Sequence, residues 1–382
     1  MKYRQVAFNT LLVMVSTLGG LLLCEIAARV FLNPADYLSI SMVEHNILGR
    51  AVAPEAAGYD DWGFRNKAVP GQADIVAIGD SHTYGNTAKM EESWPHVLAQ
   101  LTGMSVYNMG MGGYGPNQYY YLFKTRVPDL KPQVVLCGLY LGDDFENAFS
   151  VTYGLDYWSY LRQGSFDGAD ADIWQTPDDP AWFKTIRVWM SQNSVIYQIV
   201  FHGPLLGRVK GNLRIGNASR QQDRQTATLI LVEENIHEAF RPIGLRDRLQ
   251  QNRGSVREGM RITFNLLKDM NEKCRESNSR FAVVVIPTKE LVFEDYLEHN
   301  ANIQLVEVID ELLLNERRAR KELFEFFRAS GIRYVDTLPA LKRSVRNELY
   351  VRSDRDMHPG RNGYKVIAEA VGEYLTKSDF LQ

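Results

Sequence analysis

Short, fully apolar segments alternate with amphipathic segments along most of this 382-residue chain, and this alternation limits the folds it can adopt. Five apolar segments have the length of buried strands: 75–78, 105–107, 134–140, 281–286 and 333–335. Helices are expected from apolar residues at helical spacing in 94–101, 117–126, 260–274, 303–329 and 364–375. Strands that are apolar on both faces are typical of a parallel sheet covered by helices. We therefore expect a flavodoxin-like three-layer α/β/α sandwich with a five-stranded parallel sheet.

The spacing of these segments indicates an insertion. Residues 150–257 are too many for one crossover between the third and fourth strands, so the main domain is expected to comprise 74–149 and 258–382, preceded by a lead-in at 33–73. Four tryptophans lie in the insertion: Trp158, Trp174, Trp182 and Trp189. They could line a lid or a carbohydrate-stacking surface, or they could pack the insertion's own small core.

The N-terminal segment, residues 1–32, has the composition of a membrane anchor or a signal segment. Lys2 and Arg4 precede an apolar stretch at 6–23, whose 18 residues are just enough to span a bilayer. The basic flank is expected to stay cytoplasmic, which would place the remaining chain in the periplasm or outside the cell. The stretch has no polar face, which argues against a buried helix of a soluble protein.

A cleaved signal peptide is the main alternative to a retained anchor. Residues 26–28, Ile-Ala-Ala, could serve as its cleavage site. Glu25 and Arg29 are spaced as an i,i+4 pair, however, and a helix that continues through them favours an uncleaved anchor.

Charge and cysteine content argue against nucleic-acid binding, a cysteine-bound metal site and a disulfide framework. The net charge is −3 and the pI is near 6.2, which gives no reason to expect nucleic acid as a partner. Cys24, Cys137 and Cys274 are far apart and show neither metal-ligand spacing nor a disulfide framework. No metal or other cofactor is expected.

Polar motifs follow the expected strands where each strand ends. Ser81 follows the first strand, Gly113 the second, Asp143 the third and Lys289 the fourth. The carboxyl ends of parallel strands share one edge of the sheet, so these residues should converge there. Ser81 alone reads equally as a helix N-cap, because serine is common at that position.

Four short blocks together resemble the SGNH (GDSL-like) hydrolase family, and they span most of the chain outside the N-terminal segment and the insertion. The blocks are Gly79-Asp80-Ser81, residues 108–115, Leu141-Gly142-Asp143-Asp144 and Asp356-Met357-His358-Pro359. The chain order, with the serine first and Asp-x-His last, is that of SGNH esterases. Alginate-type acetyltransferases resemble this fold but place Asp-x-His before the serine.

The resemblance implies a role for each residue. Ser81 is expected to be the nucleophile, and His358 the base that takes its proton. Asp356 would hold the imidazole tautomer, with Asp354 as a second candidate for that acid. The amides of Ser81 and Gly113 would stabilise the oxyanion, together with the residue at position 143.

Asp143 departs from the family pattern, which places a donating asparagine there. An ionised carboxylate accepts hydrogen bonds and would repel an oxyanion. Three explanations remain open: Asp143 is protonated, Asn147 or Asn108 supplies the donor, or turnover is slow. Losing one oxyanion donor typically lowers the rate by about 10²–10³.

Two further segments look like those of bacterial membrane-linked members of the family. These are residues 61–66, before the first strand, and 286–290, after the fourth. Lys289 in the second segment could meet an anionic or sugar group at the rim of the site, or it could be a solvated residue of the next helix. His82 is expected to be structural. Asp80 is expected to support the nucleophile loop through backbone hydrogen bonds, without a role in proton transfer.

The leading interpretation is a membrane-anchored serine esterase that works outside the cytoplasm through an acyl-serine intermediate. An O-acetyl group on an envelope or exported polysaccharide is the expected substrate class. One alternative is an O-acyltransferase that passes the same acyl group to a sugar hydroxyl. Another is a non-catalytic carbohydrate-binding protein that keeps the fold, for which Asp143 is the best support.

Overall fold

The predicted five-stranded parallel sheet is present. The computed structural model describes residues 2–54, 56–164, 166, 181–202, 229–233, 236–300, 303–351, 356–377 and 380. The strand order is β4-β3-β5-β8-β9, with every neighbouring pair parallel. The strands are β3 (Ile75–Gly79), β4 (Val106–Gly110), β5 (Val134–Tyr140), β8 (Arg280–Ile286) and β9 (Arg333–Asp336). This order is that of a doubly wound, flavodoxin-like sheet, which confirms the expected fold class.

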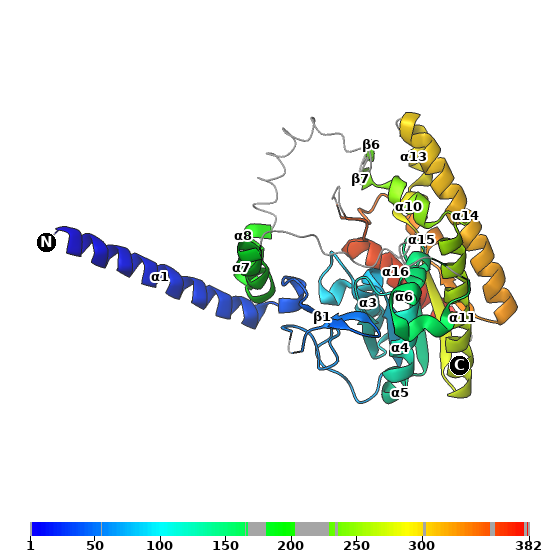
Figure 1. The fold of residues 1–382 in the computed structure, drawn as a ribbon, viewed down its shortest axis with the longest axis horizontal. Helices are drawn as coiled ribbons and strands as arrows, with labels where there is room; N and C mark the ends of the chain where they lie inside the picture. The colour runs from blue at the N-terminus through cyan, green and yellow to red at the C-terminus, as the bar shows by residue number, and fades with distance from the viewer. Residues whose placement is uncertain are drawn as a thin grey trace. The chain divides into compact units, whose positions relative to one another are not determined.

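Helices cover both faces of the sheet (Figure 1). On one face, α3 (Trp94–Thr102) packs against α16 (Arg361–Lys377). On the other, α11 (Gly254–Glu276) packs against α4 (Pro116–Thr125) and α6 (Asp144–Gly154). Every residue of β3 and β5 is buried, as expected for strands with a helical layer on each side.

The alternation of side chains along the strands explains the two layers. Ile75 and Ala77 share a hydrophobic cluster with Trp94 of α3 and Ile367 of α16. Val76 lies between them and is equally buried but belongs to the opposite face. Because successive strand residues point to opposite faces, one buried apolar strand supplies both cores.

Further elements extend this framework. The long helix α14 (Ile303–Ser330) packs against α10 (Pro242–Arg248), and β6 (Leu229–Glu233) pairs antiparallel with β7 (Ile236–Phe240). The remaining short elements are η1 (Pro34–Asp36), β1 (Met42–His45), β2 (Gly49–Val52), α2 (Ser81–Tyr84), η2 (Met90–Glu92), α5 (Val127–Leu130), η3 (Asp156–Leu161), α12 (Lys289–Val292), α13 (Glu294–Asn300) and α15 (Leu338–Arg343).

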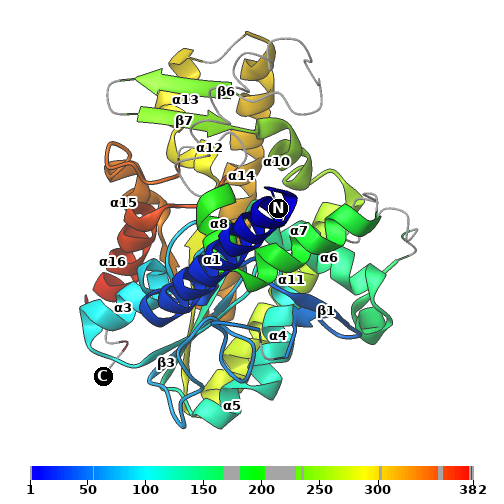
Figure 2. The same ribbon diagram turned by 90° about the vertical axis from the view of Figure 1, so that its left-hand side faces the viewer.

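The N-terminal segment forms one long helix, α1 (Lys2–Phe31), which Figure 1 shows from the side and Figure 2 shows with its N-terminal end toward the viewer. Among the described residues it is the helix that is long and apolar enough to cross a membrane, with a mean hydropathy of 2.1. A signal sequence would have the same properties. The expected pair is present, with Arg29 Nε 2.8 Å from Glu25 Oε1.

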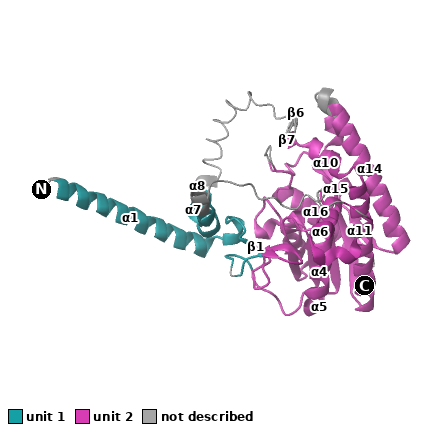
Figure 3. Ribbon diagram, in the orientation of Figure 1, with its two compact units in different colours: residues 1–42, 52–59, 176–222 teal, residues 43–51, 60–175, 223–382 magenta. Residues whose placement is uncertain are grey.

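The chain divides into two compact units (Figure 3). The smaller comprises residues 1–42, 52–59 and 176–222, and the larger comprises 43–51, 60–175 and 223–382. In the smaller unit, α8 (Val195–His202) follows α7 (Ala181–Asn193) and packs against α1. Glu25 accepts hydrogen bonds from the amides of Val195 and Ile196, which fixes the end of α1 to the start of α8.

The tryptophans of the predicted insertion have different environments. Trp158 is fully buried and donates from Nε1 to the carbonyl of Ile47 at 2.8 Å, as expected for a packing residue. Trp189 is 59% exposed. Trp174 and the side chain of Trp182 lie outside the described part of the chain.

Candidate active site

Ser81 lies at the carboxyl edge of β3, at the first position of the short helix α2. Asp80 caps this helix, with its Oδ1 accepting a hydrogen bond from the His82 amide at 2.9 Å. Gly79 lies so close to Thr83 that a Cβ there would overlap the threonine side chain. The glycine therefore permits the sharp turn from strand to helix that presents Ser81.

Ser81, His358 and Asp356 form a continuous hydrogen-bonded chain. His358 Nε2 is 2.7 Å from Ser81 Oγ, and His358 Nδ1 is 2.7 Å from Asp356 Oδ1. The segment around His358 is held by Thr87, whose hydroxyl donates to the carbonyl of Pro359 at 2.7 Å. These are the three residues that the resemblance assigned to catalysis. Asp354, the alternative acid, lies outside the described residues.

The direction of each hydrogen bond follows from Asp356. Burial acts to raise the pKa of its carboxyl, but the hydrogen bonds and charge of His358 outweigh burial and lower that pKa. An ionised carboxylate only accepts hydrogen bonds, so Nδ1 of His358 must carry the proton. Nε2 is then left as an acceptor for the Ser81 hydroxyl. This is the arrangement that general-base activation of a serine requires.

A second acid–histidine pair supports the first. His82 Nδ1 is 3.0 Å from Asp80 Oδ2, and both side chains are buried. Burial acts to raise the pKa of Asp80, but His82 outweighs it and lowers that pKa. The His82 ring stacks on Tyr140, with 3.8 Å between ring centroids, and lies 4.8 Å from the ring of His358. Asp80 also accepts a hydrogen bond from the backbone amide of His82, the kind of contact expected for it, and the buried, stacked ring of His82 is consistent with a structural residue.

The glycine block after β4 lies against the nucleophile. A Cβ added to Gly112 would be 3.9 Å from the Cβ of Ser81, and Gly113 has a φ of 77°, in the left-handed region. Asn108 fixes this loop to α2, because its amide donates to the Thr83 carbonyl at 2.9 Å while its Oδ1 accepts from the Gly110 amide. The Asn108 side chain is therefore committed to backbone groups and is not the missing oxyanion donor.

Asn147, the other candidate donor, lies beside the same loop. Its Cβ is the nearest neighbour of Gly115, where an added Cβ would overlap it. Its backbone amide donates to the Asp143 carbonyl at 2.8 Å, in the first turn of α6.

Asp143 forms an ion pair that the sequence alone did not indicate. The guanidinium of Arg248, at the end of α10, contacts Asp143 Oδ1 through Nη1. Its Nε lies 2.8 Å from Glu146 Oε2. The only sequence signal was the unbalanced charge of Asp143, which calls for a cation without saying which of the chain's 43 lysines and arginines provides it.

Asp144, the second acid of the same block, has a structural role. It is fully buried, and it accepts hydrogen bonds from the hydroxyl of Tyr119 and the amide of Tyr140, each at 2.8 Å. Burial, reinforced by the charge of Asp80, raises the pKa of Asp144 well above its usual range. The side chain fastens the end of β5 to the start of α6.

A cavity of about 210 Å³ adjoins the hydrogen-bonded chain. Its walls combine aromatic and aliphatic side chains with two carboxylates and one guanidinium. The lining residues are His82, Tyr140, Asp143, Leu245, Arg248, Asp356, Met357 and His358. Leu245 and Arg248 come from α10, so the predicted insertion contributes directly to this wall.

The environment of Lys289 differs from both sequence interpretations, which placed it at the rim of the site or in solvent. Its side chain is 0% exposed, and its Nζ is 2.5 Å from Glu238 Oε2 on β7. The ammonium also lies over the rings of Phe240 and Tyr350, at 5.3 and 5.1 Å from their centroids. Lys289 is thus neither a rim residue that meets substrate nor a solvated residue. A charge this deeply buried requires a partner, and the β6–β7 hairpin provides it.

Residues of the lead-in segment form hydrogen bonds to backbone groups near the nucleophile loop. Arg65 donates to the carbonyls of Gly85 and Ala88, at 3.2 and 2.8 Å. Asn66 donates to the Asn108 carbonyl at 2.9 Å. The motif at 61–66 therefore acts through backbone groups around α2 and β4.

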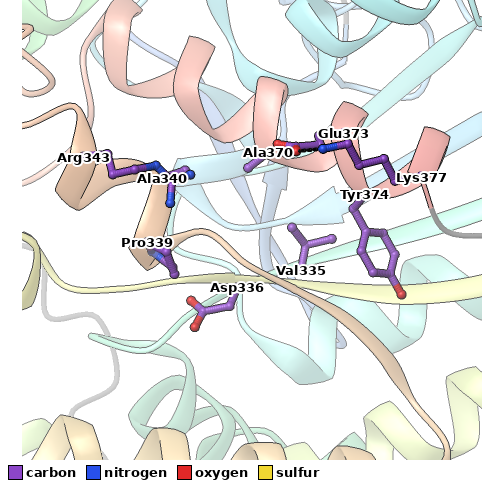
Figure 4. A pocket seen from close by; sticks show the side chains of 9 residues that line it. All are labelled: Val335, Asp336, Pro339, Ala340, Arg343, Ala370, Glu373, Tyr374 and Lys377. Atoms are coloured by element: carbon purple, nitrogen blue, oxygen red, sulfur yellow. Dashed lines mark hydrogen bonds and ion pairs between the residues drawn. The ribbon is translucent and has the colours of Figure 1, made fainter.

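A larger cavity, of about 450 Å³, lies between β9, α15 and α16, away from Ser81. Figure 4 shows the Glu373–Lys377 pair at its wall. Asp336, also at the wall, is 2.6 Å from Arg320. These charged groups are already partnered, and no side chain of the hydrogen-bonded chain reaches this cavity.

No protein-family model and no curated protein matches the chain. Solved structures do match it. A lipolytic protein of the G-D-S-L family from Desulfitobacterium hafniense DCB-2 has a TM-score of 0.37 and 14% identity, covering 78% of this chain and 97% of that one. A catalytic mutant of an acetylxylan esterase from Geobacillus stearothermophilus has a TM-score of 0.35 and 12% identity, covering 82% and 98%.

A GDSL-like lipase from Bacteroides thetaiotaomicron VPI-5482 has a TM-score of 0.34 and 11% identity, covering 80% of this chain and 88% of that one. The first and the third of these neighbours are described as GDSL proteins, the type that the four sequence blocks resemble. Their TM-scores and identities are low, so the chemistry open to the site follows from its own geometry.

Proposed function

We propose that this protein is a serine ester hydrolase in which Ser81 is the nucleophile, His358 the general base and Asp356 the residue that orients His358. The observation that carries the proposal is the pair of 2.7 Å contacts that link the three side chains. A helix cap at Ser81 would need no such partners, because capping uses the side chain toward the backbone of its own helix.

The proposed reaction has two steps. In the first, Ser81 Oγ attacks the ester carbonyl while its proton passes to His358 Nε2, and His358 then gives that proton to the departing alkoxide. In the second, His358 takes a proton from water, the hydroxide attacks the acyl-serine, and Ser81 leaves with the proton returned to it. Asp356 stays ionised and stabilises the imidazolium in both steps.

The oxyanion that forms in each step needs fixed donors. Ser81 is the first residue of α2, so its amide has no partner within that helix. The Gly112–Gly113 backbone lies beside it, and the Gly113 amide is the second donor that we propose. Two backbone donors would give the oxyanion fixed hydrogen bonds that do not depend on the side chain at position 143.

The cavity supports a small, uncharged acyl ester as the substrate. A volume of about 210 Å³ accommodates a short acyl group more readily than a fatty-acyl chain. Two carboxylates against one guanidinium in its wall disfavour an anionic substrate. We therefore propose an O-acetyl ester, with a carbohydrate as the alcohol portion and the site outside the cytoplasm. The last point depends on Lys2 and Arg4, the basic residues that flank the apolar helix α1 and are expected to stay cytoplasmic.

Labelling with a fluorophosphonate tests the nucleophile directly. The full chain in detergent should be labelled stoichiometrically and should hydrolyse p-nitrophenyl acetate. Ser81→Ala should lose both, whereas Ser277→Ala, a change at an exposed helix end, should keep both. Failure of the wild-type protein to label would support the non-catalytic interpretation instead. Product analysis with acetyl donors and oligosaccharides separates hydrolysis from acyl transfer.

A further inference from the structure

Arg248 joins the predicted insertion to the position where the site departs from the family pattern. One guanidinium contacts two carboxylates of the α6 start, Asp143 through Nη1 and Glu146 through Nε. Arg248 also lines the 210 Å³ cavity together with Asp143 and His358. The ion pair is therefore part of the wall that faces the reacting groups.

An unpaired carboxylate at position 143 would harm an esterase. It has no proton to donate to the developing oxyanion, and its negative charge would repel that oxyanion. A neutral asparagine amide can donate a hydrogen bond and carries no charge that would repel the oxyanion. The chain must therefore offset the charge of Asp143 if Ser81 is to react at a useful rate.

Arg248 has the chemistry to do this. Burial acts to lower the pKa of its guanidinium, but Asp143 and Glu146 outweigh burial and raise that pKa. The group is thus permanently charged, and its five N–H donors exceed those used by the two carboxylates. Arginine is also better suited than lysine to bridging two carboxylates, because its planar fork presents several donors at fixed angles.

The insertion holds Arg248 in place. α10 packs against α14, and Leu249, the next residue, is fully buried. Within α10, Arg246 contacts Asp247 at 2.8 Å and Glu311 of α14 at 3.6 Å. These contacts hold the backbone of α10 in place without any contribution from the ion pairs of Arg248. The position of the helix in turn places the guanidinium of Arg248 beside α6.

We propose that Arg248 is a positioning residue that replaces the missing asparagine: it neutralises Asp143 and turns a repulsive group at the oxyanion site into a neutral ion pair. This inference depends on the proposed esterase function. It makes α10 a required part of the active site. The sequence had left the insertion open between a lid, a carbohydrate-stacking surface and a segment that packs its own small core.

A purely structural ion pair is the competing explanation. The side chains of Arg248 and Asp143 are 44% and 35% exposed, and a pair of this kind contributes little to stability. Loss of the pair should then leave activity unchanged. The two explanations differ because only ours predicts that removing the charge of Asp143 makes Arg248 dispensable.

The test is a double-mutant cycle that compares wild type, Arg248→Gln, Asp143→Asn and the double variant. For each protein, kcat and KM are measured on p-nitrophenyl acetate with the full chain in detergent. We expect Arg248→Gln to lower kcat by about 10²–10³ with little change in KM, since the loss falls on the transition state. Asp143→Asn and the double variant should both lie within about tenfold of wild type.

Two further variants serve as controls. Arg257→Gln removes an exposed ion pair with Glu322 of α14, away from the cavity wall, and should keep wild-type kcat. Arg248→Lys keeps the positive charge and should therefore recover part of the kcat that Arg248→Gln loses; no recovery in a folded Arg248→Lys variant would count against the role of that charge. Thermal melts of each variant check that folding is retained.

The outcomes separate this inference from the proposed function. An active wild type with a double variant as slow as Arg248→Gln would overturn the role of Arg248 and leave the esterase assignment standing. Unchanged kcat in Arg248→Gln would do the same. A wild type that neither hydrolyses the ester nor reacts with a fluorophosphonate would overturn both.

Discussion

His358 Nε2 lies 2.7 Å from Ser81 Oγ, although 277 residues separate the two in the chain. The contact forms because β3 delivers Ser81 to the carboxyl edge of the sheet while the segment before α16 crosses the same edge. Pro359 of that segment forms an isolated bridge with Tyr350. The C-terminal helix therefore has to pack on the sheet before the site is complete.

Asp356→Asn should lower kcat by about 10⁴ without loss of fold, because an amide no longer specifies the Nδ1–H tautomer of His358. The measurement is ester hydrolysis by wild type and variant at the same pH. Asp354→Asn is the matched control and should keep activity. A larger loss at Asp354 than at Asp356 would transfer the orienting role to Asp354.

Lys289→Met should destabilise the protein by roughly 3–5 kcal/mol, because it leaves the charge of Glu238 buried without its partner. Lys289→Met combined with Glu238→Gln should recover much of that loss. Urea denaturation followed by circular dichroism measures both values. Equal stability of wild type and Lys289→Met would show that the ion pair forms no part of the folded state.

Glu290 should make stability depend on pH. Burial raises its pKa to about 7, from an ordinary value of 4.5. The folded state therefore binds the proton more tightly than the unfolded state. Its contribution to the unfolding free energy is full below pH 4.5 and is lost as pH rises to about 7, by up to roughly 3 kcal/mol.

Glu290→Gln should flatten this dependence. The measurement is the difference in unfolding free energy between pH 5 and pH 8 for wild type and variant. We expect the variant to lose less stability over that interval. An identical loss in both proteins would assign the pH dependence to other groups.

Gly110→Ala should destabilise the protein by more than about 2 kcal/mol, because the added methyl group would overlap the backbone nitrogen of Tyr84 in α2. Gly71→Ala is the control, since a Cβ at that exposed position meets nothing within 4 Å. Thermal melts of the two variants measure the contrast. A tolerated Gly110→Ala would mean that the β4 loop and α2 are not closely packed.

The N-terminal helix should hold the protein in membranes. Full-length protein should sediment with the membrane fraction and require detergent for release, whereas residues 33–382 should stay in the soluble fraction. Mass spectrometry of the mature N-terminus distinguishes the two forms of this segment. A terminus near residue 28 would identify a cleaved signal peptide instead of a retained anchor.

The sheet and its helices were predictable because buried parallel strands have a local signature. Residues 134–140 and 281–286 are apolar on both faces, and no other common element combines that composition with that length. The strand order then follows from short right-handed crossovers. Ser81, Asp356 and His358 were identified by short motifs, which also depend only on neighbouring residues.

The charge pairs were not predictable in the same way. The sequence placed Lys289 beside the sheet edge but gave no sign that the hairpin at 229–240 would cover it and supply Glu238. It showed that Asp143 was unsuited to an oxyanion site but could not select Arg248 as its counter-ion, since the two lie 105 residues apart.

The sequence by itself thus determined the fold class, the candidate catalytic residues and the apolar N-terminal helix, all of which are encoded in local patterns of polarity and in short motifs. The tertiary structure decided which ionised groups meet. Coulomb interactions depend on distance and burial, and both are set only when α10 packs against α14 and β7 brings Glu238 to Lys289. Asp143 shows the difference most clearly: in the sequence it is a misplaced carboxylate, and in the folded protein it is one half of an ion pair with Arg248.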